Sequence, residues 1–265
     1  MLQEIRDPVL TFGGVSKRFP DGTVALAGFD LTVASGEFVS VVGPSGCGKS
    51  TLLRLASGLS TASEGSVLAA TDRLGYVFQD PTLLPWRTVQ ANVELLAELS
   101  RLPKTERHRR AEEAIRLVGL SEFARHHPGA LSGGMRMRVS LARSLTMQPE
   151  LFLFDEPFGA LDEITRERLN DELQQLFLTQ RFTALFVTHS VTEAVFMSTR
   201  VVVMSGRPGQ VLGDFPVPFD YPRPPRLRFE EEFAHLAGEV SRCLRGGKGR
   251  AGPPPQHQVD GIARR

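Results

Sequence analysis

The amino-acid sequence predicts an α/β protein with a mainly parallel central sheet, and three observations lead to that fold class. Short apolar runs alternate along the chain with segments whose apolar residues recur at helical spacing. The apolar runs are rich in β-branched and aromatic residues and stop at glycine or polar residues, as buried parallel strands do. Between residues 80 and 145 the alternation gives way to helical patterns, which predicts an inserted α-helical subdomain.

The N-terminal elements are expected to be strands. Val9–Phe12 and Ala27–Val33 are short apolar runs separated by a polar turn, and we assign them to an N-terminal antiparallel β part. Phe38–Val42, with the sequence FVSVV, is a continuous apolar run that stops at a glycine-rich loop, which is typical of a buried parallel strand. Helical spacing then starts at Lys49 and ends at Gly58.

The inserted region follows the predicted strand Gly75–Gln79. Its sequence predicts amphipathic helices with charge-dense outer faces at Val89–Leu99 and Thr105–Val118, and a third helix at Arg136–Leu145. These helices form the subdomain expected at residues 80–145.

Alternation of strand and helix resumes after the insertion. Leu151–Phe154, Thr183–Val187 and Val201–Met204 are the predicted strands, with helices at Ile164–Leu178 and from Val191 onward. We therefore expect one folded domain over residues 8–245. The remaining segment, residues 246–265, carries too little apolar surface to offset its ordering entropy and is expected to be a disordered tail.

Composition excludes several classes of protein. The net charge is +1, from 31 basic and 30 acidic residues, so the chain lacks the strong positive field of a nucleic-acid binder. Its two cysteines form neither a metal cluster nor a disulfide framework. No apolar stretch approaches the roughly 18 residues that span a bilayer, and the N-terminus lacks a secretory signal. We expect a cytoplasmic chain that meets a membrane only through another protein.

The loop between the strand Phe38–Val42 and the next helix has the composition of a phosphate-binding loop. Its glycines let successive backbone N–H groups point at an anion, and the helix adds its positive end. Lys49 supplies charge for the β- and γ-phosphates, and Ser50 supplies a hydroxyl for Mg²⁺. A chance match of this spacing occurs in roughly one chain in a hundred, and the strand–loop–helix context makes it rarer. The predicted nucleotide-binding residues are Gly43, Pro44, Ser45, Gly46, Cys47, Gly48, Lys49, Ser50 and Thr51.

A second acidic element completes this site. Asp155 follows the apolar run LFLF, at the carboxyl end of a predicted strand, where ligands bind in parallel sheets. We expect Asp155 to hold Mg²⁺, directly or through water, and Glu156 to polarise the attacking water. The alternative is a solvated Asp-Glu turn, which four preceding buried residues disfavour.

With these motifs the chain resembles the ATP-binding subunits of ABC transporters from about Val9 to Phe219. LSGGM at Leu131–Met135 resembles the signature sequence of that family, which lies just before a helix. By this resemblance a hydroxyl and backbone N–H groups contact the γ-phosphate of ATP held by a partner subunit. The residues concerned are Ser132, Gly133 and Gly134.

Four further matches carry roles over from the family. Gln79 matches the glutamine that contacts Mg²⁺ and water, although an isolated Gln at a strand end is unremarkable. His189, after the strand TALFVT, matches the histidine that contacts the γ-phosphate, against the alternative of a structural His. Phe158–Asp162, FGALD, resembles the segment after the catalytic Glu. Phe19 matches the aromatic residue that stacks on adenine, with a core Phe as the alternative.

The chain departs from the family pattern at three positions. The signature ends in Met135 instead of Gln, Ser190 replaces Asp after the histidine, and Phe19 stands where Tyr is commoner. None of these changes removes the loop lysine or the two acidic residues, so ATPase activity with Mg²⁺ is expected to be intact.

The resemblance also implies partners. In the family two such domains dimerise head to tail, so we expect a homodimer or a pair with a sister subunit. A chain without a membrane span implies separate permease subunits, an extracytoplasmic solute-binding protein and a location on the cytoplasmic face of the membrane. Leu83, Leu84 and Trp86 lie in the region that meets the permease, and burial within the helical subdomain is the alternative.

The transported solute is suggested only by overall similarity. The segments Asp80–Val93 and Met204–Phe219 resemble the nitrate, sulfonate and taurine branch of importers, which implies a small oxyanion. The second hypothesis is a non-transport ABC-type ATPase of DNA repair or translation, and the third is a GTPase or kinase. The absence of a long coiled coil or a second cassette argues against the second hypothesis, and LSGGM argues against the third.

Overall fold

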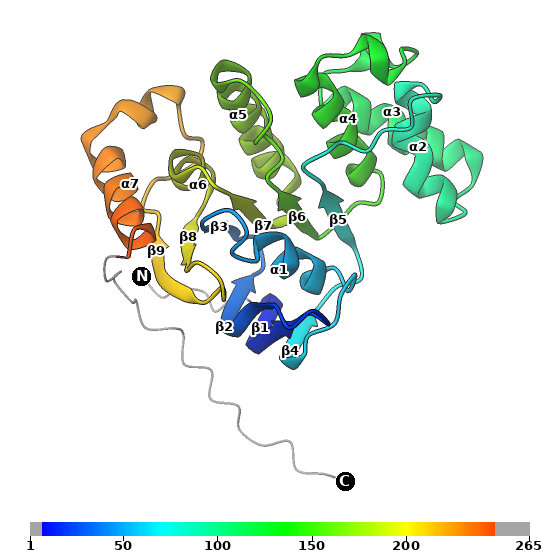
Figure 1. Ribbon diagram of the computed structural model, residues 1–265. Helices are drawn as coiled ribbons and strands as arrows, with labels where there is room; N and C mark the ends of the chain where they lie inside the picture. Colours follow the sequence, from blue (N-terminus) through cyan, green and yellow to red (C-terminus); the bar gives the residue numbers. More distant parts are fainter. Residues whose placement is uncertain (1–6, 247–265) are drawn as a thin grey trace.

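A computed structural model describes residues 7–246 of the chain. Residues 1–6 and 247–265, which hold almost all of the predicted tail, lie outside the described residues. The described part contains a three-stranded antiparallel sheet and a six-stranded sheet with helices on both faces (Figure 1). The antiparallel sheet has the order β2-β1-β4, with β1 at Pro8–Arg18, β2 at Val24–Ala34 and β4 at Glu64–Ala69.

The six-stranded sheet confirms the predicted mainly parallel architecture. Its order is β5-β6-β7-β3-β8-β9, and each neighbouring pair is parallel except β8 and β9. The strands are β3 (Phe38–Val42), β5 (Leu74–Val77), β6 (Leu151–Asp155), β7 (Thr183–Thr188), β8 (Arg200–Met204) and β9 (Val211–Pro216).

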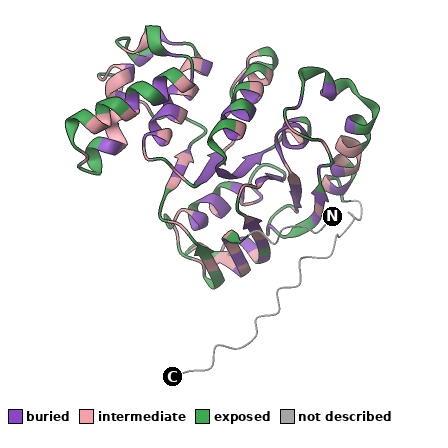
Figure 2. Ribbon diagram, turned by 180° about the vertical axis from the view of Figure 1, so that it is seen from behind, coloured by how far each residue is buried: buried purple, intermediate pink, exposed green. Residues whose placement is uncertain are grey.

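Most residues of these strands are buried (Figure 2). The strands present apolar side chains alternately to two cores, one on each face of the sheet. On β3, Phe38 and Val42 face one hydrophobic cluster, whereas Val39 and Val41 face the other. The first cluster is covered by α5 (Glu163–Gln180), α6 (Val191–Met197) and α7 (Glu231–Leu244). The second is covered by α1 (Lys49–Ala56) and the antiparallel sheet.

Three helices beyond the β5 edge of the sheet share a separate core (Figure 1). The helices are α2 (Val89–Leu99), α3 (Lys104–Leu117) and α4 (Gly133–Leu145), and two short 3₁₀ turns at Ser121–Phe123 and Pro128–Ala130 connect the last two. Val93, Ile115 and Val139 are nearly inaccessible to solvent within that core. The helices thus form a body with its own interior, apart from the two clusters around the sheet.

Three elements differ from the sequence expectation. The strand β4 was not predicted because most of its residues are exposed and show no apolar alternation. The antiparallel edge strand β9 was missed because its sequence, VLGDFP, contains glycine and proline. Helix α7 was missed because charged residues mask its apolar stripe, whose buried members are Phe233, Val240 and Cys243.

The helices were also compared with the length and hydropathy of membrane-spanning segments. Among residues 7–246, no helix is both long enough and apolar enough to cross a membrane.

Candidate functional site

The predicted phosphate loop lies between β3 and α1. Gly48, directly before α1, has a φ of 110°, and Gly46 has a φ of 75°, so both positions adopt backbone conformations that favour glycine. A Cβ atom at Gly43 would lie 2.7 Å from the Cys47 sulfur. Burial raises the pKa of the Cys47 thiol, which leaves this side chain as a protonated filler beneath the loop.

Lys49 folds back onto this loop. Its side chain is 5% exposed, and its ammonium group donates to the carbonyl oxygens of Gly43 and Pro44 at 2.9 and 3.1 Å. The same nitrogen lies 3.2 Å from a carboxylate oxygen of Glu156. A full positive charge is thereby held at the opening of the loop, where the N-terminal end of α1 also favours an anion.

The pair Ser50 and Asp155 forms an oxygen-rich corner beside the loop. The Ser50 hydroxyl donates to Asp155 Oδ1 at 2.9 Å, and the Tyr76 hydroxyl donates to Oδ2 at 3.3 Å. Burial raises the pKa of the Asp155 carboxyl, although both hydrogen bonds oppose that shift. The Ser50 hydroxyl oxygen and the Asp155 carboxylate oxygens suit Mg²⁺, which prefers oxygen ligands and takes one or two protein ligands beside phosphate oxygens. Within residues 7–246, no cluster of three or more His, Cys, Asp or Glu forms a separate metal site.

Glu156 lies between two nitrogen groups from different elements. His189 Nδ1 is 2.9 Å from Oε2, and the Lys49 ammonium approaches Oε1. Partial burial by itself raises the pKa of the Glu156 carboxyl, but the His189 hydrogen bond and the Lys49 charge outweigh it and lower that pKa overall. Glu156 has a φ of 44°, an uncommon value outside glycine that is often found at functional sites.

The structure thus brings together Lys49, Ser50, Asp155, Glu156 and His189 at the carboxyl ends of β3, β6 and β7. Lys49 and Ser50 lie more than a hundred positions before the other three residues, and the sequence alone gives only their order. The carboxylate Glu156 and the imidazole His189 are in direct contact, which is the arrangement of a base and the group that orients it.

Two other predicted residues follow the ends of β5 and β1. Gln79 is exposed two positions beyond the end of β5, whose last residue, Val77, pairs with Phe154, two positions before Glu156. Phe19 is half-buried in the turn after β1 and is absent from both cores, which disfavours the alternative of a core Phe. Its ring lies 5.6 Å from the Lys17 ammonium.

The segment that resembles the family signature lies at the start of α4. The Ser132 side chain caps this helix by accepting from Met135 N at 3.3 Å, and the serine is exposed. A Cβ atom at Gly134 would lie 3.0 Å from Thr165 on α5. The glycines therefore permit close packing of α4 on α5. No described hydrogen bond or ion pair of residues 7–246 joins this segment to the phosphate loop.

Two further residues at the site, Tyr76 and Arg207, belong to none of the motifs in the sequence. Tyr76 contacts Asp155, and burial raises its own pKa. The Arg207 guanidinium donates to the carbonyl oxygen of Gly46 through two nitrogens, at 3.1 and 3.2 Å. The only signal for Arg207 was its place in the Gly/Pro-rich segment after β8, whose carboxyl end lies next to that of β3.

Comparison with protein families gives one match, a model described as ABC transporter, over residues 26–159. The aliphatic sulfonates import ATP-binding protein SsuB of Rhodopseudomonas palustris is 44% identical over 239 residues, covering 89% of this chain and 83% of SsuB. The bicarbonate transport ATP-binding protein CmpC of Synechococcus elongatus is 44% identical over 224 residues. That match covers 79% of this chain and 34% of CmpC.

Solved structures give the same result for the fold. The dimeric structure of MJ0796, a bacterial ABC transporter cassette, has a TM-score of 0.70 and 32% identity, and the match covers 80% of this chain and all of that cassette. The same cassette has also been solved as a dimer in a post-hydrolysis state bound to ADP and Pi.

Proposed function

The chain belongs to the ABC transporter family, and we propose that it is the ATP-hydrolysing subunit of an importer. The observation that carries this function is the contact of Glu156 with both Lys49 and His189, at the mouth of the phosphate loop. In that position a carboxylate can receive a proton from a water molecule that attacks the γ-phosphate.

Each residue of the site then has a separate task. The loop N–H groups and Lys49 bind the β- and γ-phosphates, and Glu156 orients and deprotonates the water. His189 holds the carboxylate in place through its 2.9 Å contact and reaches toward the γ-phosphate. Phe19 stacks on the adenine ring. When ATP binds, Lys49 exchanges its contacts with loop carbonyls and Glu156 for phosphate oxygens, which releases Glu156 for catalysis.

Mg²⁺ would enter with ATP and neutralise charge on the phosphates during transfer. The residues that would hold it are Ser50 and Asp155, whose oxygen atoms already face each other, with Gln79 contributing from the end of β5. A divalent cation there would favour the ionised form of Asp155 and oppose the effect of burial on its pKa.

The active site is completed by a second subunit. The chain has one phosphate loop and one signature segment, and the two make no described contact within residues 7–246. A head-to-tail dimer would set Ser132, Gly133 and Gly134 against the ATP of the partner subunit. The dimeric cassette MJ0796 supports this arrangement, and either a homodimer or a pair with a sister subunit would satisfy it.

We further propose the domain limits and the place of action. Residues 8–245 make up the ATP-binding domain, residues 80–145 its helical subdomain, and the segment from residue 246 onward a tail. The subunit would act on the cytoplasmic face of the membrane, bound to permease subunits that receive solute from an extracytoplasmic binding protein. Importer ATP-binding relatives support this location.

A small oxyanion is the proposed solute, with sulfonate, taurine and nitrate as the candidates. The sulfonate importer SsuB and the bicarbonate transporter CmpC, each 44% identical to this chain, both support an anionic solute. Uptake measured in cells that lack the chain would test this class. Normal uptake of all three solutes would contradict it.

Replacement of the catalytic carboxylate tests the function itself. We expect Glu156→Gln to bind ATP with Mg²⁺ but to hydrolyse it about a hundredfold or more slowly, because the amide cannot accept the proton of water. The ATP-bound dimer should then accumulate, which size-exclusion chromatography with ATP would detect. Glu163→Gln, at an exposed position of α5, is the control and should hydrolyse ATP normally. Full activity in Glu156→Gln would show that another group is the base.

A further inference from the structure

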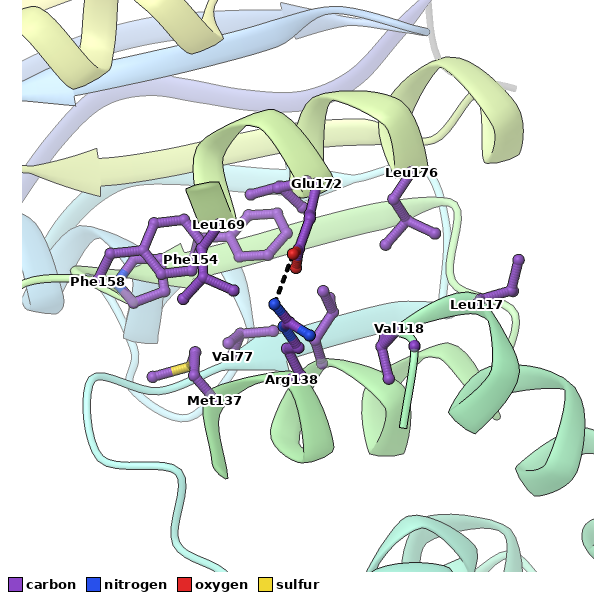
Figure 3. A pocket seen from close by; sticks show the side chains of 14 residues that line it. Val77, Leu117, Val118, Met137, Arg138, Phe154, Phe158, Leu169, Glu172 and Leu176 are labelled. Atoms are coloured by element: carbon purple, nitrogen blue, oxygen red, sulfur yellow. Dashed lines mark hydrogen bonds and ion pairs between the residues drawn. The ribbon is translucent and has the colours of Figure 1, made fainter. Parts of the chain in front are cut away.

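An apolar cavity of about 250 Å³ lies between α4 and α5, apart from the phosphate loop (Figure 3). Its walls include Leu141 on α4, Leu173 and Leu176 on α5, and Phe154 at the end of β6. It is larger than the roughly 150 Å³ apolar cavity that binds benzene in an engineered protein. The cavity is therefore large enough for an apolar group of several carbon atoms.

One charged pair interrupts this apolar lining. Arg138 on α4 donates through Nη2 to Glu172 on α5 at 2.5 Å, and Figure 3 shows the two side chains pointing toward each other with apolar side chains on both sides. The Arg138 side chain is 15% exposed, and its Nε is buried without a hydrogen-bond partner. Nη2 is the guanidinium nitrogen that pairs with Glu172, so Nη1 can donate to a second carboxylate placed beside Glu172.

The cavity also adjoins the candidate site. Pro157 and Phe158, which follow Glu156 directly, form part of its wall, and so does Val77, two residues before Gln79. Met137 and Arg138 belong to the helix that Ser132 caps. A molecule bound here would thus contact three segments that carry site residues, which suits the cavity to a regulatory role.

From these contacts we propose that the cavity between α4 and α5 is a second binding site, for a small amphiphilic carboxylate. The apolar chain of the ligand fills the space beside Leu173 and Leu176, and its carboxylate accepts hydrogen bonds from Arg138. Apolar burial supplies most of the affinity, and the guanidinium supplies the preference for an anion.

Calorimetric titration of the full chain with decanoate and with decanol tests this site without any need for ATP. We expect saturable binding of both ligands, with decanoate bound about tenfold more tightly because only the carboxylate pairs with Arg138. Equal affinity for decanol and decanoate would overturn the assignment of a carboxylate ligand. The absence of saturable binding would overturn the site.

Two variants locate the binding and identify the charge that is recognised. Leu173→Phe adds volume inside the cavity and should lower the affinity for both ligands about tenfold or more. Glu172→Gln keeps the shape of the side chain but removes the carboxylate that competes for Arg138. The affinity for decanoate should therefore rise about fivefold, and the affinity for decanol should stay unchanged. Unchanged decanoate affinity in either variant would contradict the proposal. Because Glu172→Gln hardly alters volume, it remains informative if Leu173→Phe fails to fold.

Discussion

At the scale of single residues, Arg207 gives the phosphate loop a support that no motif predicted. It donates through two guanidinium nitrogens to the Gly46 carbonyl, and a Cβ atom at Gly46 would lie 3.6 Å from one of them. Gly209, two residues later, exchanges backbone hydrogen bonds with Ala25 and Ala27. The segment after β8 is thus hydrogen-bonded both to the phosphate loop, at Gly46, and to β2.

We expect Arg207→Ala to raise the KM for ATP about fivefold, or about 1 kcal/mol of binding free energy, with little change in kcat. The hydrogen bonds orient the loop before ATP binds and do not touch the reacting atoms. ATPase kinetics on the purified chain would measure both constants. Arg226→Ala, at another exposed arginine, is the matched control and should change neither. A large fall in kcat for Arg207→Ala would instead indicate a role in the chemical step.

Glu193, beside the His189 segment, is a buried acid that the structure satisfies best in its protonated form. Its side chain is 6% exposed and bonds to Thr188, and Asn170 lies within hydrogen-bonding reach. Oε1 of Glu193 and Oδ1 of Asn170 both lack a described partner. A proton on Oε1 of Glu193 would let that oxygen donate to Oδ1 of Asn170, so that both atoms would have a partner. In agreement with this, burial raises the pKa of the Glu193 carboxyl above its ordinary value.

Glu193→Gln should therefore remove a pH dependence of stability. The folded state holds this proton more tightly than the unfolded chain, whose pKa is near 4.5, so the stabilisation is greatest below that pH. It is lost as pH rises through the raised pKa of the folded state. Urea unfolding at pH 5 and pH 8 should show the variant gaining stability relative to the wild type at the higher pH. A constant difference between the two proteins would contradict this assignment, and Glu122→Gln, at an exposed acid, serves as the control.

At the scale of elements, the segment between β5 and α2 presents an apolar surface. Trp86 is 72% exposed, which removes the alternative of burial for this residue, whereas Leu83 and Leu84 are half-buried. Replacing a large exposed aromatic residue hardly changes the folding stability of the isolated chain. The same residue contributes strongly to binding free energy where a partner covers it.

Trp86→Ser should leave the unfolding free energy of the chain unchanged within about 0.5 kcal/mol and leave its basal ATPase intact. Co-purification with permease subunits should fall about tenfold or more. Leu99→Ser at the end of α2, a residue 70% exposed, is the matched control, because it removes a comparable apolar side chain elsewhere on the helical subdomain. An equal fall in permease co-purification for both variants would mean that Trp86 makes no specific contact with the permease.

The strength of the local pattern decided which elements could be predicted. The runs FVSVV and LFLF are buried on both faces, so their composition alone indicated β3 and β6. Helix α7 carried a usable signal, since Phe233, Leu236, Val240 and Cys243 recur at helical spacing, but its acidic start concealed that signal. The strand β4 had none, because pairing with β1 and not burial holds it in the sheet.

At the scale of the whole molecule, the order of the motifs was predictable but their distances were not. Lys49 and Glu156 are 107 positions apart in sequence and meet because β3 and β6 both pair with β7 in one parallel sheet. The same sheet carries His189 to Glu156 from the end of β7. The signature segment lies on a different body of the molecule, the helices with their own core, and within residues 7–246 no hydrogen bond or ion pair joins it to the phosphate loop of its own chain.

Mixing two inactive chains would test whether the active site is shared between subunits. Lys49→Ala removes the charge of the phosphate loop, and Ser132→Arg blocks the signature segment, so each variant alone should lack ATPase activity. A mixed dimer retains one composite site with both parts intact. After subunit exchange about half of the dimers are mixed, so about a quarter of the wild-type rate should return if the sites act independently.

The control for this experiment pairs two variants damaged in the same half of the site. Lys49→Ala mixed with Ser50→Ala leaves a defective phosphate loop at every interface, so its rate should stay at the level of the parent chains. Recovery in that control would mean that subunit mixing itself restores activity. If Lys49→Ala with Ser132→Arg fails to recover while an affinity-tagged Lys49→Ala chain co-purifies untagged Ser132→Arg, the signature segment does not complete the site of the partner subunit. A rate above both parents would require the head-to-tail arrangement, since no single chain in the mixture carries both intact parts.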